Sequence, residues 1–191
     1  MPFGAFLAGR HAKRGQLRYR ARYQGQETLS KRPVSHVGFS VSDLKRSRLF
    51  YRTLLGFEEV TSWTRSEPYI GELTGNPGAV IHTAIMKLPD DPLLLELVQY
   101  DRTDGRAIEP ASANPGAAHL GLNVENLDSL YASLLEKGAE FVSSPVTPTV
   151  GPNAGGRAVL LLDPDGFRIE LVQTGRSLDG ERIPASSRRS P

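Results

Sequence analysis

Alternating apolar and polar positions mark the start of two similar segments of the chain. In residues 35–41 every second side chain is apolar, and residues 118–124 repeat this alternation. A period of two is typical of a β-strand that buries one face. We therefore predict a strand at the start of each segment, with its apolar face packed under a helix. The apolar positions are Val37, Phe39 and Val41 in the first segment and Leu120, Leu122 and Val124 in the second.

A helix is predicted after each of these strands. Asp43 and Asn126 stand where the N-cap of a helix belongs, because short polar side chains bind the free backbone N–H groups there. Gly56 and Gly138 suit the C-terminal ends of the two helices. The expected helices cover residues 44–54 and 127–137. Three later strands are expected in each segment: 58–63, 79–87 and 93–99 in the first, and 140–143, 157–162 and 167–173 in the second.

The two segments are related as an internal repeat. The run His36-Val-Gly-Phe-Ser-Val41 matches His119-Leu-Gly-Leu-Asn-Val124, and Leu-Glu-Leu-Val-Gln at 95–99 matches Ile-Glu-Leu-Val-Gln at 169–173. The sequence therefore predicts an α+β fold in which two βαβββ modules form a curled mixed sheet. The expected organisation is a basic extension at 1–33, a first module at 34–102, a linker at 103–116, a second module at 117–174 and a flexible tail at 175–191.

A His and a Glu recur at matching positions of this repeat. Each His lies on the strand face opposite to the apolar one, and each Glu lies between apolar neighbours on a later strand. A carboxylate there is costly unless it faces water or is paired, and packing alone does not require these residue types. Two imidazoles and two carboxylates suit Zn, Ni, Co, Mn or Fe(II). We therefore expect His36, Glu96, His119 and Glu170 to meet around one cation.

Composition and charge narrow the class of protein. The 191 residues include no Cys, which excludes disulfides, thiolate nucleophiles and Cys-ligated metal sites. No apolar run approaches the length of a membrane span. Residues 1–33 carry eight Lys or Arg and one acid, whereas residues 34–191 carry fifteen basic and twenty acidic side chains. A nucleic-acid reader usually carries positive charge on its fold, so we expect a cytoplasmic protein with neither nucleic acid nor membrane as partner.

These motifs resemble the vicinal oxygen chelate superfamily, which includes glyoxalase I, bleomycin-resistance proteins and extradiol dioxygenases. The run from His36 to Leu44, together with Phe50-Tyr51 and Leu54-Leu-Gly-Phe57, is similar to the opening of the superfamily. The run Asp163-Pro-Asp-Gly-Phe-Arg-Ile-Glu-Leu171 is similar to its closing hairpin. The resemblance covers residues 35–173 and implies the fold, whereas the superfamily supports many reactions on that fold.

The resemblance also implies a metal enzyme. His36, Glu96, His119 and Glu170 fall on the four metal-ligand positions of bacterial glyoxalase I. The implied cofactor is a divalent ion, Zn or Ni ahead of Fe(II), Co or Mn. The implied reaction is that of a lyase, isomerase or epimerase, which acts through an enediolate on a small substrate with vicinal oxygens. Glu170 is the expected base, Glu96 a ligand or second base, and the protein is expected to be a homodimer.

Two other functions stay open at this stage. An extradiol-type Fe(II) dioxygenase would use three ligands, which fall on His36, His119 and Glu170, and would need an inward-pointing His such as His82. A metal-free protein that sequesters an antibiotic or metabolite is the second alternative. The complete set of four donors argues against it, because a pure binder has no need of them.

The positions that would contact the substrate differ in part from those of glyoxalase I. Glyoxalase I grips the glutathione carboxylates with an Arg and an Asn, at positions where this chain has Ser40 and Tyr100. Both differences argue against glutathione adducts as the substrate. The Pro- and Gly-rich loop at 144–156 resembles a lid. The side chains expected to contact substrate are His82, Tyr100, Arg157, Trp63 and Tyr69.

Overall fold

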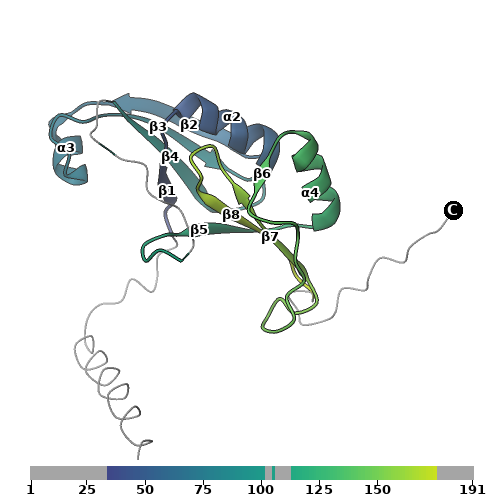
Figure 1. Cartoon of the computed structure of the whole chain (residues 1–191). Coiled ribbons are helices and arrows are strands. Elements are labelled where there is room, and N and C mark those ends of the chain that lie inside the picture. The colour runs from purple at the N-terminus through teal and green to yellow at the C-terminus, as the bar shows by residue number, and fades with distance from the viewer. Residues whose placement is uncertain (1–33, 102–104, 106–112, 176–191) are drawn as a thin grey trace, which may run out of the picture. The chain divides into compact units, whose positions relative to one another are not determined.

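The computed structural model describes residues 34–101, 105 and 113–175 (Figure 1). The chain divides into two units, Met1–Val34 and Ser35–Pro191, and the helices and strands below belong to the second. The predicted extension, most of the linker and nearly all of the tail lie outside the described residues. In the described ranges, no helix combines the length and apolar character needed to cross a membrane.

Two βαβββ-like modules, each built on a four-stranded mixed sheet, make up the fold and confirm the predicted α+β class (Figure 1). The first module contains β1 (Val37–Ser40), α2 (Leu44–Leu55), β2 (Glu58–Arg65), α3 (Pro68–Thr74), β3 (Val80–Lys87) and β4 (Leu94–Asp101). The second contains β5 (His119–Asn123), α4 (Leu127–Glu136), β6 (Glu140–Phe141), β7 (Arg157–Leu162) and β8 (Arg168–Gln173).

Both sheets have the same topology. The strand order is β1-β4-β3-β2 in the first sheet and β5-β8-β7-β6 in the second. The first and last strands of each module pair in parallel, and the remaining neighbours are antiparallel. The sequence repeat is therefore a repeat of structure, and matching residues occupy matching positions in the two sheets.

Each sheet buries the face that its helix covers. Phe39 and Leu97 of the first sheet and Leu120 and Leu171 of the second are buried, as the alternation of apolar positions predicted. Burial of one such side chain contributes about 1.5–3 kcal/mol. The buried residues of both modules form one continuous hydrophobic cluster, so the modules share a core on their helix-covered faces. The opposite face of each sheet is left to carry the His and Glu side chains.

Local side-chain chemistry sets the ends of the two long helices. Asp43 caps α2 through a hydrogen bond from the backbone N of Arg46 to its Oδ1 at 2.9 Å, and Gly56 ends this helix with a φ of 75°. Both features confirm the predicted helix limits. Asn126 precedes α4 but makes no side-chain capping bond, contrary to the prediction, and its φ of 50° is left-handed.

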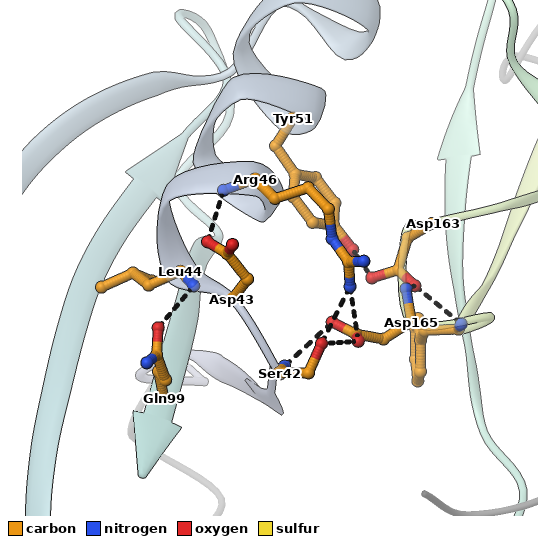
Figure 2. A network of polar contacts seen from close by, with 9 residues as sticks. Ser42, Asp43, Leu44, Arg46, Tyr51, Gln99, Asp163 and Asp165 are labelled. Carbon is orange, nitrogen blue, oxygen red and sulfur yellow. Dashed lines mark hydrogen bonds and ion pairs between the residues drawn. The ribbon is translucent and has the colours of Figure 1, made fainter. Parts of the chain in front are cut away.

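A repeated Gln binds the start of both long helices, including α4, whose own cap is missing. Gln99 Oε1 accepts a hydrogen bond from the backbone N of Leu44 at 2.7 Å, and Gln173 Oε1 accepts one from the backbone N of Leu127, also at 2.7 Å (Figure 2 shows the first). In each module, a side chain from the last strand thus satisfies a free N–H at the start of the helix. This contact explains why Gln occupies the same position in both copies of the repeat.

The short helix α3 is absent from the elements predicted by the sequence. Pro68 opens the helix with a backbone already fixed near helical φ, and Gly75 ends it with a φ of 71°. Seven residues are too few to show a clear helical period, which is why the pattern missed the element. Buried Ile70 anchors α3 to the first sheet in a second cluster with Ala79 and Ile81.

Candidate functional site

The first predicted donor pair lies on the adjacent strands β1 and β4. Gly38 is the register partner of Glu96, and His36 lies two residues before this Gly on the same face of the sheet. His36 Nε2 lies 3.3 Å from Glu96 Oε2. A Cβ at position 38 would stand 3.5 Å from that carboxylate oxygen, so the absence of a side chain keeps the space beside the pair open.

The second module repeats this geometry on β5 and β8. Gly121 is the register partner of Glu170, and His119 Nε2 lies 3.3 Å from Glu170 Oε2. Solvent reaches both pairs, since the His and Glu side chains are 46% and 24% exposed in the first module and 57% and 35% exposed in the second. The open face of each module therefore presents one imidazole and one carboxylate at hydrogen-bonding range.

The donor types fit a divalent ion, but one pair does not complete its coordination. Imidazole nitrogen with carboxylate oxygen suits Zn, Ni and related metals, which normally take four or more ligands. In the part of the chain that the structure describes, no group of three or more His, Cys, Asp or Glu side chains is placed to hold a metal. The structure thus brings the four expected ligands together as two pairs, whereas the sequence predicted one group. The physical reason is that the modules join through their helix-covered faces, and the donors occupy the opposite faces.

Two of the expected substrate contacts lie on the face of the first donor pair. The strand register places Trp63 and Tyr100 on the same side of the sheet as Glu96. The guanidinium carbon of Arg65 lies 5.7 Å from the centre of the Trp63 ring, within the range of a cation–π contact. Tyr69 lies on α3 and is about half exposed.

His82 points to the face opposite to Glu96, so it does not provide the inward-pointing His that the dioxygenase alternative would need. Its register partner is Gln99, whose side chain reaches the start of α2. His82 Nδ1 lies 2.9 Å from Thr64 Oγ1, and its Nε2 lies 2.9 Å from Asp101 Oδ2. The period of two along β3 therefore separates His82 from Glu96 by the thickness of the sheet.

Arg157 also lies on a helix-covered face, apart from Glu170. Its Nη2 donates to Asp128 Oδ1 at 2.6 Å, its Nε donates to the same oxygen at 3.1 Å, and its Nη1 donates to Thr147 Oγ1 at 3.0 Å. Asp128 belongs to the first turn of α4, and Thr147 belongs to the loop predicted as a lid. Arg157 thus ties this loop to the helix, a structural task that already engages its guanidinium.

A pocket of about 1040 Å³ opens where the parallel strands β1 and β4 end. Its lining includes Ser40, Asn76, Ala79, Tyr100 and Asp101. Ser40 and Tyr100 are the two positions at which this chain differs from the residues that grip glutathione in glyoxalase I. The structure brings both to one pocket.

A polar network that the sequence analysis did not single out joins the two modules (Figure 2). Asp165, in the turn before β8, accepts hydrogen bonds from the backbone N of Ser42 at 3.1 Å and from Arg46 Nη2 at 2.8 Å. The hydroxyl of Ser42 also donates to Asp165. The Asp-Pro-Asp-Gly turn was recognised, but nothing in the sequence indicated that Asp165 binds the start of α2.

The buried end of this network is a contact between Tyr51 and Asp163 (Figure 2). The hydroxyl of fully buried Tyr51 donates to Asp163 Oδ2 at 3.1 Å. Burial raises the pKa of Asp163 above its usual value, although hydrogen bonds from the backbone N of Phe167 and Asp165 oppose the shift. Burial, together with the charge of Asp163, also raises the pKa of Tyr51. The phenol therefore stays protonated and acts as a donor between the modules.

Comparison with known proteins agrees with this architecture. A 2-epi-5-epi-valiolone epimerase from an Actinomyces species is 30% identical over 146 residues, which are 73% of this chain and 78% of that protein. A probable lactoylglutathione lyase from Synechocystis is 26% identical over 155 residues, covering 75% of this chain and 97% of the lyase. The crystal structure of a glyoxalase family protein from Bacillus cereus, 20% identical, superimposes with a TM-score of 0.64 over 76% of this chain and 98% of that one.

The family model for the Glyoxalase/Bleomycin resistance protein/Dioxygenase superfamily matches residues 34–171, nearly all of both modules. This match covers the repeated strands, the donor pairs and the closing turn together. The duplicated module, its strand order and these matches lead to one assignment. The chain belongs to the glyoxalase/bleomycin resistance protein/dioxygenase superfamily.

Proposed function

We propose that this protein is a metal-dependent lyase, isomerase or epimerase of the glyoxalase type, acting on a small substrate with oxygens on adjacent carbons. One observation carries the proposal: a His–Glu pair recurs in the same register, with the same 3.3 Å separation, on the open face of both modules. Two relatives named as an epimerase and a lactoylglutathione lyase support the reaction class.

The complete metal site is proposed to form between two copies of the chain. Each pair supplies two donors, and the described residues of one chain offer no larger group. In a homodimer, His36 and Glu96 would face His119 and Glu170 of the partner subunit. The four donors would then hold one divalent ion, Zn or Ni ahead of Fe(II), Co or Mn.

The chain's own residues are proposed to move the proton. A bound divalent ion supplies Lewis-acid polarisation of two substrate oxygens, which lowers the pKa of the C–H bond between them. Glu170 takes the proton from that carbon, leaving an enediolate, and then returns it. Return by Glu170 to the neighbouring carbon would give an isomer, and delivery of a proton by Glu96 to the other side of the same carbon would give an epimer. Glu96 is the proposed second base.

Elemental analysis of protein purified without added metal tests the proposal. We expect Zn or Ni at one ion per chain, and we expect each of the variants His36→Ala and His119→Ala to lose most of it. The variant Glu170→Gln is expected to keep much of the metal but to lose exchange of the substrate C–H proton in deuterated water. Glu72→Gln, which removes an exposed carboxylate of α3, is the matched control.

The same measurement separates the alternatives. Oxygen-sensitive Fe(II) would instead support the dioxygenase, although His82 does not supply the inward-pointing His that this reaction needs. Protein that binds no metal after reconstitution would overturn the proposal and support a metal-free sequestering protein.

Mixing two double variants tests the shared site. His36→Ala/Glu96→Gln destroys one half-site, and His119→Ala/Glu170→Gln destroys the other. If each site is built from two chains, a mixed dimer contains one site with four intact donors and regains metal binding that neither variant shows alone. Mixtures that regain no metal, or wild-type protein that sediments as a monomer at micromolar concentration, would rule out the shared site.

A further inference from the structure

We infer that Thr83 is a specificity-determining residue of the proposed reaction, and that its buried hydroxyl forms a hydrogen bond with a third oxygen of the substrate, outside the vicinal pair. The inference rests on the proposed function, which places the reacting carbon beside His36 and Glu96. It narrows the substrate class to small molecules that carry a further hydroxyl or carbonyl oxygen close to the two oxygens that bind the metal.

The hydroxyl of Thr83 is buried without a hydrogen-bond partner. Thr83 is 1% exposed, and its Oγ1 is bonded to no other group in the part of the chain that the structure describes. Buried side-chain hydroxyls are normally paired, because folding removes the water that binds them in the unfolded chain. Thr83 therefore lowers the stability of the ligand-free protein, although Val has the same shape and would avoid this cost.

Thr83 lies beside Glu96 on the open face of the first sheet. It is opposite Val98 in the register of β3 and β4, and Glu96 comes two residues before Val98 on the same face. Diagonal neighbours of this kind are about 7–8 Å apart. A small substrate that binds at Glu96 would therefore reach Thr83 with an atom only a few bonds from the reacting carbon.

The other neighbours of Thr83 on this face are apolar. Ile81 and Ile85, two residues before and after it on β3, are both buried. Away from Glu96, Ile81 and Val98 pack with Ile70 of α3, so this end of the face is closed by apolar side chains. The adjacent polar group is thus the carboxylate of the proposed site. For this reason we assign the partner of the hydroxyl to a molecule bound at Glu96.

The second module shows that the sheet itself does not need this hydroxyl. Ala158 on β7 occupies the position that corresponds to Thr83, because it is opposite Val172 as Thr83 is opposite Val98. Both sheets nevertheless have the same strand order. The repeat thus keeps a His and a Glu in each module but has the hydroxyl in the first alone, as expected if it serves one particular substrate atom.

The edge of the sheet offers a route to the buried hydroxyl. Trp63 on β2 is opposite Thr83 in the register, and β2 is an edge strand. Nearly every residue of β2 is exposed, and Trp63 itself is partly exposed. Its side chain therefore has room to move outward when a substrate approaches Thr83. Because Trp63 is the single Trp of the chain, its fluorescence reports on this position alone.

Two hydroxamates of equal size test the inference on the Zn-loaded full chain. Glycolohydroxamate and propionohydroxamate bind a metal through the same two oxygens and have the same number of non-hydrogen atoms, but only glycolohydroxamate has a third oxygen. Isothermal titration calorimetry gives each Kd. We expect glycolohydroxamate to bind about fivefold more tightly, because propionohydroxamate leaves the Thr83 hydroxyl unpaired. Its binding should also shift the fluorescence emission of Trp63.

Substitutions assign the preference to the hydroxyl. Thr83→Val should abolish the preference between the hydroxamates and, with no hydroxamate present, raise the melting temperature by about 2–4 °C. Thr83→Ser keeps a hydroxyl and should restore most of the preference. Ser47→Ala is the matched control, because Ser47 on α2 has the other buried hydroxyl without a partner among the described residues. It should also raise the melting temperature, but it should leave the preference unchanged.

Each outcome decides the inference. Equal binding of the two hydroxamates, a preference that survives Thr83→Val, or binding that leaves the Trp63 emission unchanged would overturn the role of Thr83 and leave the proposed metal site intact. A Thr83→Val variant that melts below the wild type would show that the hydroxyl is bonded within the fold, and would also overturn it. Protein that binds neither hydroxamate would refute the proposed function, and the inference with it.

Discussion

Asp163 accepts three hydrogen bonds beside the shared core, so its replacement by Ala is expected to destabilise the protein strongly. Its Oδ2 accepts from the Tyr51 hydroxyl at 3.1 Å, and its Oδ1 accepts from the backbone N of Asp165 at 2.9 Å and of Phe167 at 2.7 Å. Asp163 is 5% exposed and Tyr51 is fully buried, so water cannot replace these bonds in the folded state.

The expected costs differ between the two partners. Asp163→Ala leaves the Tyr51 hydroxyl buried without an acceptor, which costs about 1–3 kcal/mol, and it also frees two turn amides. We expect a total loss of about 3 kcal/mol in the free energy of unfolding. Tyr51→Phe removes one hydrogen bond without changing the ring, and about 1 kcal/mol is expected. In the double variant no hydroxyl is left unpaired, so the losses should fall short of additivity by about 1 kcal/mol.

Urea unfolding of the wild type, both single variants and the double variant measures this coupling. The circular dichroism signal at each urea concentration gives the free energy of unfolding by linear extrapolation. Asp90→Asn, an exposed Asp on the corresponding hairpin of the first module, serves as the control and should stay close to the wild type. Losses that add to within the measurement error would refute the reasoning that the contact between Tyr51 and Asp163 is formed and buried.

The same contact predicts an unusual pH dependence. Burial raises the pKa of Asp163 in the folded state, so the folded protein holds this proton at pH values where the unfolded chain has released it. The contribution of Asp163 to stability is then greatest below its ordinary unfolded pKa near 3.8, and it is lost as the pH rises through the folded value. Asp163→Asn should remove this component, and the difference in stability between wild type and variant should therefore change across that range.

Five further substitutions test the local structure. Gly156→Ala should lower the free energy of unfolding by more than about 2 kcal/mol, because a Cβ there would lie 2.2 Å from the backbone oxygen of Gln173. A Cβ at Gly121 would meet nothing within 4 Å, so the Gly121→Ala variant should melt near the wild-type temperature. In urea unfolding, Gln173→Ala should lower the free energy of unfolding by about 1 kcal/mol. Gln99→Ala should lower it less, because Asp43 also caps α2, and equal losses would contradict this reasoning. Arg157→Ala should lower stability by about 1 kcal/mol and leave the metal content unchanged, so lost metal would contradict its structural role.

The predicted fold could be read from the sequence because its signals are local. The alternation from Val37 to Val41, the cap at Asp43 and the left-handed Gly56 each depend on a few neighbouring residues. The duplication strengthened them, since each element appeared twice in the same order. Helix α3 was missed because seven residues around Ile70 are too few for a period to emerge.

Side-chain direction across strands could be predicted only where the strand's own alternation revealed it. Apolar neighbours on both sides indicated the face of Glu96, and the alternation that starts at Val37 indicated the face of His36; the pair forms at 3.3 Å. Around His82, apolar and polar positions do not alternate cleanly, so its face was decided by pairing with β4. Arg157 was likewise placed by the register of β7 with β8.

The sequence alone therefore determined the two modules, their buried faces and the strand face that carries each donor, because each follows from periodicity within a strand or a helix. Only the tertiary structure decided which partners those elements meet. In the tertiary structure Tyr51 donates a hydrogen bond to Asp163, and Ser40 and Tyr100 line one pocket. The four donors lie there as two separate pairs. Such encounters depend on how distant segments pack, and the spacing of residues along a chain does not specify them.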